Sequence, residues 1–84
     1  MTGIINVVGR PAKAEAWQWT GNYADIPADW RALDLFTEQD DGSLLVRTLR
    51  GPVPCRLGEY VIRRKAGDFY PIDPLTYAER WEEQ

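Results

Sequence analysis

The sequence lacks histidine, and it holds one cysteine and one methionine in 84 residues. Without histidine, the chain can form neither a Cys–His nucleophilic pair nor a histidine-ligated zinc site. A single cysteine excludes an intramolecular disulfide, which fits a reducing compartment. We expect Cys55 to be a small apolar side chain in a strand. No cofactor motif and no metal-ligand spacing occurs, so we predict neither a cofactor nor a metal site.

Long hydrophobic runs are also absent. No apolar stretch approaches the roughly 20 residues that a membrane helix needs, and the N-terminus has no pattern of a signal peptide. We therefore expect a cytoplasmic protein with no membrane partner. The length allows one domain, residues 1–84, in which residues 1–10 form a loose arm or an edge strand.

Aromatic residues, in contrast, are abundant: four Trp, four Tyr and two Phe. In residues 12–20 the alternation places Trp17 and Trp19 on one face, which predicts a strand with its Trp face inward. The dipeptide Asp41-Gly42 predicts a hairpin turn before a strand at 43–49. In that strand Leu45, Arg47 and Leu49 share one face. Further strands are predicted at 35–38, 59–64 and 69–72, and Pro52 and Pro54 fit only an edge or irregular strand.

Two short helices complete the predicted fold. Ile26, Trp30 and Leu33 recur at helical spacing, so residues 26–33 predict a helix with one apolar face. Asp73 followed by Pro74 predicts the capped start of a second helix, which docks through Tyr77 and Trp81. Its last residues, 82–84, are expected to fray into solvent. The predicted fold class is α+β: a small antiparallel β-meander of four to six short strands packed against two short helices.

The C-terminal half carries a family resemblance. Gly58-Glu59-Tyr60, Gly67-Asp68-Phe69-Tyr70-Pro71 and Tyr77 with Trp81-Glu82 follow one another, and Glu15 to Gly21 forms an aromatic first strand. The segment resembles a group of small proteins of unknown function encoded by bacteriophages and prophages. Leu57 stands where that group usually has proline, and Glu59 stands for aspartate. The resemblance implies a phage origin and a bacterial host cell, but no catalytic residues.

Charge is segregated along the chain. Residues 1–41 hold three basic and seven acidic side chains, whereas residues 42–68 hold six basic and two acidic ones. The first segment predicts an acidic binding surface anchored by a partly exposed Trp30, with Tyr23, Asp25, Asp29 and Asp34. The second predicts a basic strip with two tyrosines for stacking: Arg47, Arg50, Arg56, Arg63, Arg64, Lys65, Tyr60 and Tyr70. For each set, an ordinary solvated face whose charges form ion pairs is the simpler explanation.

Catalysis finds no support in these residues. Glu59 and Asp68 flank one hairpin and could approach each other, but turn formation explains both. We predict a non-enzymatic phage accessory protein that binds a host protein, for example as an inhibitor of an antiviral defence such as CRISPR. One alternative is a nucleotide-sequestering protein that uses the basic strip; another is a virion-associated structural protein. A homodimer is left open, and the net charge of −3 argues against direct nucleic-acid binding.

Overall fold

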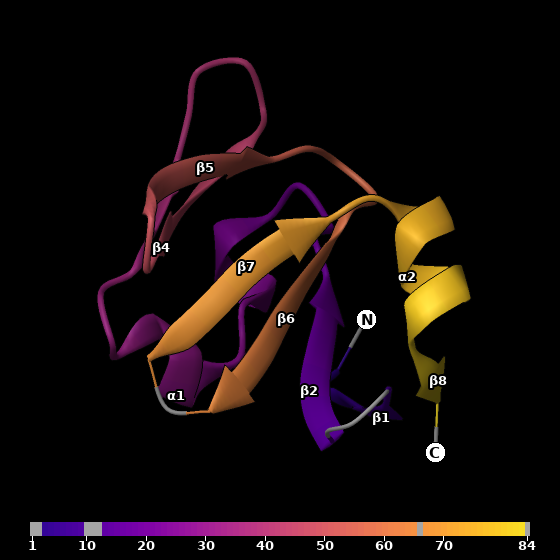
Figure 1. The fold of residues 1–84 in the computed structure, drawn as a ribbon. Helices are drawn as coiled ribbons and strands as arrows, with labels where there is room; N and C mark the ends of the chain where they lie inside the picture. Colours follow the sequence, from indigo (N-terminus) through magenta and orange to yellow (C-terminus); the bar gives the residue numbers. More distant parts are fainter. Residues whose placement is uncertain (1–2, 10–12, 66, 84) are drawn as a thin grey trace.

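Two antiparallel sheets form the framework of the protein. The structure, a computed structural model, describes residues 3–9, 13–65 and 67–83. The larger sheet has the strand order β7-β6-β2-β1-β8, and the smaller sheet has the order β3-β4-β5 (Figure 1). The strands are β1 Ile5–Val8, β2 Lys13–Gln18, β3 Phe36–Glu38, β4 Leu44–Thr48, β5 Gly51–Cys55, β6 Tyr60–Lys65, β7 Asp68–Ile72 and β8 Glu82–Glu83. The predicted α+β class is confirmed, with eight strands in the described residues rather than four to six.

Two α-helices lie on opposite sides of the larger sheet. The helix α1 spans Ala28–Arg31 and α2 spans Pro74–Arg80, and a 3-10 turn at Tyr23–Asp25 precedes α1. Figure 1 shows α2 on one side of the sheet, with α1 and the smaller sheet on the other. The larger sheet is therefore covered on both faces, which accounts for the apolar residues on both sides of its central strands.

The inner core lies between the two sheets. Trp17 and Trp19 are 0% and 1% exposed, which confirms the inward Trp face predicted for β2. Their rings meet edge to face at 5.8 Å, and the Trp19 indole N–H donates to the carbonyl of Gly42 at 2.9 Å. This bond ties β2 to the β3–β4 hairpin. The cluster is completed by Ile26, Trp30, Phe36, Leu44, Val46, Cys55, Val61 and Phe69.

A second core fills the space between the larger sheet and α2. Its buried members are Val7, Ala14, Ala16, Ile62 and Tyr77. As predicted, Asp73 caps α2 by accepting a hydrogen bond from the Thr76 N–H, with Pro74 in the first turn. Tyr77 stacks on Tyr60 with 3.7 Å between ring centroids, and Trp81 packs on the same cluster. The predicted docking of α2 through Tyr77 and Trp81 is therefore confirmed.

The smaller sheet follows the turn signals in the sequence. Gly42 has a φ of 89°, and the Ser43 N–H donates to the Asp41 carboxylate at 2.9 Å, which closes the β3–β4 hairpin. Pro52 and Pro54 lie in β5, an edge strand of this sheet, as their missing N–H groups require.

Burial explains the protonation state of Cys55. The residue is fully buried at the end of β5, which confirms its predicted place in a strand. Desolvation, with a smaller contribution from the Glu59 carboxylate, raises the pKa of the Cys55 thiol from 9.0 to about 12. Because the thiolate is the nucleophilic form, the native protein holds Cys55 unreactive at neutral pH.

The first helix is shorter than the sequence predicts. It covers Ala28–Arg31 rather than residues 26–33, with Pro27 at its N-cap. Ile26 and Trp30 are buried as expected, but Leu33 lies beyond the helix and is 43% exposed. The chain leaves helical geometry at Asp34, whose φ of 58° redirects it toward β3. Leu33 therefore does not lie on one helix face with Trp30, as it would in a longer helix.

Strands near both ends of the described chain are paired with each other. All four residues of β1 pair with β2, and Val7 and Val8 also pair with Glu83 and Glu82 of β8. The predicted fraying of residues 82–84 is therefore wrong for Glu82 and Glu83; Gln84 lies outside the described residues. The Tyr77 hydroxyl donates to Glu83 at 3.1 Å and helps to hold β8 beside β1.

The junction of α2 and β8 packs closely on Gly9. A Cβ added at Gly9 would lie 2.8 Å from the Arg80 carbonyl oxygen and 2.9 Å from the Trp81 ring. We expect Gly9→Ala to lower the free energy of unfolding by about 1–3 kcal/mol, because neither backbone nor a packed ring can yield easily. Denaturant unfolding checks this value.

Gly3→Ala is the matched control, since a Cβ at Gly3 meets no atom within 4 Å. We expect this change to alter stability by no more than about 0.5 kcal/mol. Equal effects of the two substitutions would contradict the close packing at Gly9.

Candidate functional sites

The acidic surface predicted around Trp30 does not contain Trp30, because this residue is buried. Trp30 is 0% exposed; its ring stacks on Phe36 with 6.3 Å between centroids and meets Phe69 edge to face at 5.0 Å. The prediction that Trp30 is partly exposed is therefore wrong. The reason is tertiary, because the short α1 closes one end of the space between the sheets and points its largest side chain inward.

The other members of that surface serve different local roles. Tyr23 is half-buried against the inner core, and Asp25 accepts a hydrogen bond from the Thr20 hydroxyl at 2.8 Å. Asp34 is exposed and adopts a left-handed backbone conformation, which aspartate tolerates better than most residues. Asp29, also exposed, faces an arginine of β6.

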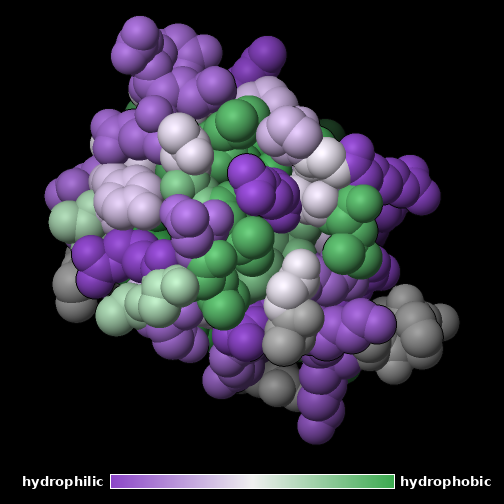
Figure 2. Space-filling model, turned by 90° about the vertical axis from the view of Figure 1, so that its left-hand side faces the viewer, coloured by the Kyte–Doolittle hydropathy of each residue, from purple (hydrophilic) through white to green (hydrophobic). Residues whose placement is uncertain are grey.

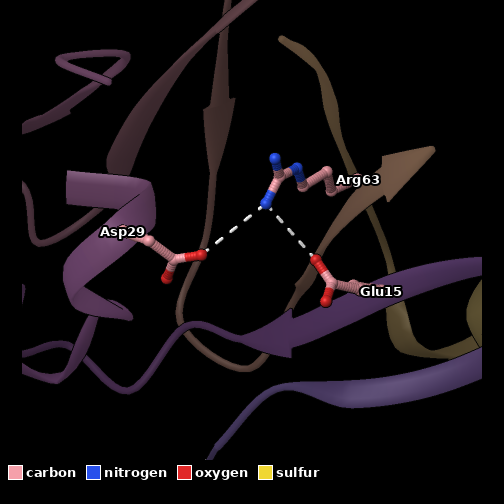
Figure 3. A network of polar contacts seen from close by, with 3 residues as sticks. All are labelled: Glu15, Asp29 and Arg63. Atoms are coloured by element: carbon pink, nitrogen blue, oxygen red, sulfur yellow. Dashed lines mark hydrogen bonds and ion pairs between the residues drawn. The ribbon is translucent and has the colours of Figure 1, made fainter. Parts of the chain in front are cut away.

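That arginine, Arg63, is the centre of a polar network. Its Nη1 atom lies 3.4 Å from the Glu15 carboxylate and 3.7 Å from the Asp29 carboxylate (Figure 3). Its guanidinium also lies 5.5 Å from the centroid of the Phe69 ring. Three elements, β2, α1 and β6, thus converge on one side chain. Because Arg63 is only 23% exposed, the network fixes its position more firmly than an exposed pair would.

The predicted basic strip does not form as one surface. Arg47 lies in β4 of the smaller sheet, and Arg50 and Arg56 directly precede and follow β5 of the same sheet. Arg63, Arg64 and Lys65 belong to β6 in the larger sheet. The chain changes sheets between Cys55 and Tyr60, so neighbours in sequence separate in space. This part of the prediction is wrong.

The two tyrosines predicted to stack bases are already engaged. One ring face of Tyr60 is covered by Tyr77, with an interplanar angle of 4°. The guanidinium of Arg64 lies 5.2 Å from the centroid of Tyr70, and burial raises the pKa of the Tyr70 hydroxyl. Both tyrosines pack against the second core beside α2, so they stabilise that side rather than offer free platforms.

The carboxylate pair considered for catalysis is separated. Glu59 precedes β6 and accepts a hydrogen bond from the Arg56 N–H at 2.8 Å, which holds the turn before the strand. Asp68 begins β7 at the other end of the same hairpin and pairs with Arg64 at 2.9 Å. The two carboxylates therefore cannot act on one substrate atom as an acid–base pair.

A concave surface occurs where β1, β2 and β6 lie side by side. It is a solvent-open hollow of about 460 Å³, lined by Asn6 of β1, residues 13–15 of β2 and residues 63–65 of β6. Four of these side chains are cationic (Lys13, Arg63, Arg64 and Lys65), and Glu15 is the acidic one. We call this feature the basic hollow. It retains three residues of the predicted strip and adds Lys13 from a distant segment.

A second surface lies on the smaller sheet. Phe36, Leu44, Val46 and Cys55 point into the inner core, so their strand neighbours point outward. These outward residues are Thr37, Leu45, Arg47, Pro52 and Pro54, which we call the outer face. Leu45 is half-buried and the other four are exposed.

Figure 2 shows the left-hand side of Figure 1, where β4 and β5 end, with hydrophobic residues in the middle of the view and hydrophilic residues around them. The alternation of Leu45, Arg47 and Leu49 in the sequence contains the signal for the outer face. The sequence alone does not show that no other element covers it.

Neither surface includes a metal site or a membrane segment. Within residues 3–9, 13–65 and 67–83, no group of three potential metal ligands comes together. No helix in these residues is long and apolar enough to cross a membrane. The fold and the two surfaces define a small α+β protein with a basic hollow and an uncovered sheet face.

Comparisons with known proteins assign no family to this chain. A scan of protein-family models gave no match. Searches of curated proteins and of solved structures also returned no significant match. The resemblance to phage-encoded proteins therefore stays a prediction.

Proposed function

We propose that this protein is a non-enzymatic binding protein that attaches to a host protein through the outer face. The observation that carries the proposal is a sheet face on which Leu45, Pro52 and Pro54 lie together, whereas most of both faces of the larger sheet is packed into the two cores. Together with the resemblance to phage proteins, this supports an accessory role in the bacterial cytoplasm, such as inhibition of an antiviral defence.

The composition of the outer face suits a protein partner. Arg47 pairs across the ladder with Pro52, and the neighbouring Leu45 pairs with Pro54. Arginine is enriched at interfaces because its planar guanidinium combines hydrogen bonding with apolar contact. The prolines are rigid, so little conformational entropy is lost when they are covered.

Charge beside the outer face indicates the kind of partner. Glu38, Asp40 and Asp41 are exposed in the β3–β4 hairpin, at the end of the smaller sheet. Interfaces pair opposite potentials, so a partner with basic residues around an apolar centre fits best. This preference also agrees with the net charge of −3.

The test is capture of host proteins by the tagged chain and by two outer-face variants, Arg47→Glu and Leu45→Asp. We expect each variant to weaken binding of the captured partner about tenfold or more. Leu45→Asp places a charge in an apolar contact, and Arg47→Glu removes the guanidinium and leaves a carboxylate that must lose its water there. Arg80→Glu and Leu75→Asp are matched controls; both positions are exposed and lie on α2.

Partner binding that persists in both outer-face variants would overturn the proposal, provided that circular dichroism shows that they fold. Equal losses in the α2 controls would overturn it as well. The virion-associated alternative gains no specific support from the surfaces described. The ligand-binding alternative is favoured by a separate feature, the basic hollow.

A further inference from the structure

We propose that the basic hollow binds the phosphate groups of a small anion such as a nucleoside triphosphate. This inference is independent of the protein partner, since the outer face belongs to the other sheet. Both lysines of the chain, Lys13 and Lys65, line the hollow. Neither of them forms an ion pair with another described residue. A lysine ammonium provides a mobile point charge that is well suited to phosphate oxygens.

Strand pairing brings these charges together. Glu15 of β2 lies opposite Arg63 of β6, and Lys13 and Lys65 line the same hollow beyond this pair. Two ammonium groups in one hollow repel each other. A bound anion would reduce this repulsion and add favourable contacts to both ammonium groups.

The two arginines are held in place before any ligand arrives. Arg63 is fixed by Glu15, Asp29 and the Phe69 ring, and Arg64 is fixed by the buried Asp68 carboxylate at 2.9 Å. The arginines are therefore held on either side of β6, Arg63 toward Phe69 and Arg64 toward Tyr70, and the lysines supply the charge that has no partner among the described residues. Preorganisation lowers the entropy that binding costs.

The lining also limits the kind of ligand. Among the described residues, no aromatic side chain lines the hollow, so these residues offer no platform for a nucleobase. Its volume of about 460 Å³ lies within the range of small-molecule sites. The negative net charge of the chain disfavours long polyanions at moderate salt. The lining of the hollow therefore favours a compact oligophosphate, which it would bind through the phosphate groups and not through a base.

Titration calorimetry of the full chain with tripolyphosphate, ATP, GTP and a single-stranded oligonucleotide tests the site. We expect the first three to bind with affinities within about threefold of one another, because the base is not read. The oligonucleotide should bind more weakly per phosphate. In NMR spectra, tripolyphosphate should shift the amides of Asn6, residues 13–15 and residues 63–65.

The variant Lys13→Gln/Lys65→Gln should weaken tripolyphosphate binding about 100-fold, at roughly tenfold for each lost charge. Arg50→Gln/Arg56→Gln makes the same change in net charge outside the hollow and should weaken binding no more than about threefold. Leu45→Asp should leave tripolyphosphate binding unchanged, which separates this site from the outer face.

Absence of tripolyphosphate binding, amide shifts outside the hollow, or equal losses in the two double variants would each overturn the proposal. Stronger binding of the oligonucleotide per phosphate would overturn the small-ligand class. If the lysine variant does not fold, the amide shifts of the unaltered chain are the test. Shifts confined to Asn6, residues 13–15 and residues 63–65 support the site, and shifts spread over the whole surface indicate nonspecific ionic attraction.

Discussion

Replacing Trp30 with alanine is expected to lower the free energy of unfolding by about 3–5 kcal/mol. Trp30 is fully buried and contacts Phe36 and Phe69 in the inner core. The substitution removes the largest side chain of α1 and leaves a cavity that a four-residue helix cannot close by moving. Because a domain of this size has little stability to spare, the variant should be largely unfolded at 37 °C. Guanidinium unfolding followed by circular dichroism measures the loss.

Two controls make the Trp30 prediction specific. Trp30→Phe should lose less, since it keeps an aromatic ring and removes an indole N–H that has no hydrogen-bond partner among the described residues. Leu33→Ala, just after the same helix at an exposed position, should change stability by about 0.5 kcal/mol or less. A Trp30→Ala variant of near-normal stability would contradict the burial of Trp30 and would support the exposed position predicted from the sequence.

Replacing Tyr77 with alanine is expected to cost about 3 kcal/mol. Tyr77 is 6% exposed, stacks on Tyr60 and donates a hydrogen bond to Glu83. Its loss leaves a cavity in the second core and removes the hydrogen bond that holds Glu83 of β8. We therefore expect hydrogen exchange to accelerate first at Val7 and Val8, where β1 pairs with β8, before it accelerates in the inner core.

Tyr77→Phe separates packing from hydrogen bonding. It keeps the stacked ring and loses only the bond to Glu83, so we expect a cost of about 1 kcal/mol. If Tyr77→Phe were as destabilising as Tyr77→Ala, the hydroxyl rather than the ring would hold α2 and β8. Unchanged exchange at Val7 and Val8 in the alanine variant would contradict the coupling of β8 to this side chain.

Features fixed by neighbouring residues could be predicted from the sequence. The cap formed by Asp73 on α2 depends on a hydrogen bond to Thr76, three residues away. The turn at Gly42 and the edge position of Pro52 and Pro54 follow from backbone chemistry that is local to each residue. The alternation of Trp17 and Trp19 likewise gives their face directly, because the side-chain period of a strand is two.

Features fixed by distant residues could not be predicted. Trp17 of β2 pairs with Val61 of β6, a choice that only the assembled hydrophobic cores determine. The division into two sheets separates Arg47 from Arg63. It also buries Trp30, which lies in the core between the two sheets. Glu82 and Glu83 have low strand propensity, yet they pair because Trp81 and Tyr77 bring them beside β1.

The candidate sites divide in the same way. Arg63, Arg64 and Lys65 could be recognised as a basic run, but Lys13 enters the hollow from a segment some 50 positions earlier, through the pairing of β2 with β6. Arg47 could be assigned to a strand face by its alternation with Leu45. Whether that face is free to bind a partner depends on whether another element of the fold covers it, and no local sequence pattern determines this.

The prolines of β5 also limit how this molecule can assemble with its own copies. Along the free margin of the smaller sheet, an approaching chain would meet carbonyl acceptors at Pro52 and Pro54 without the complementary amide donors. Pairing of another strand with β5, one of the edge strands in the described sheets, is therefore disfavoured. Association of two copies along this edge should consequently depend on side-chain contacts and not on a shared backbone ladder.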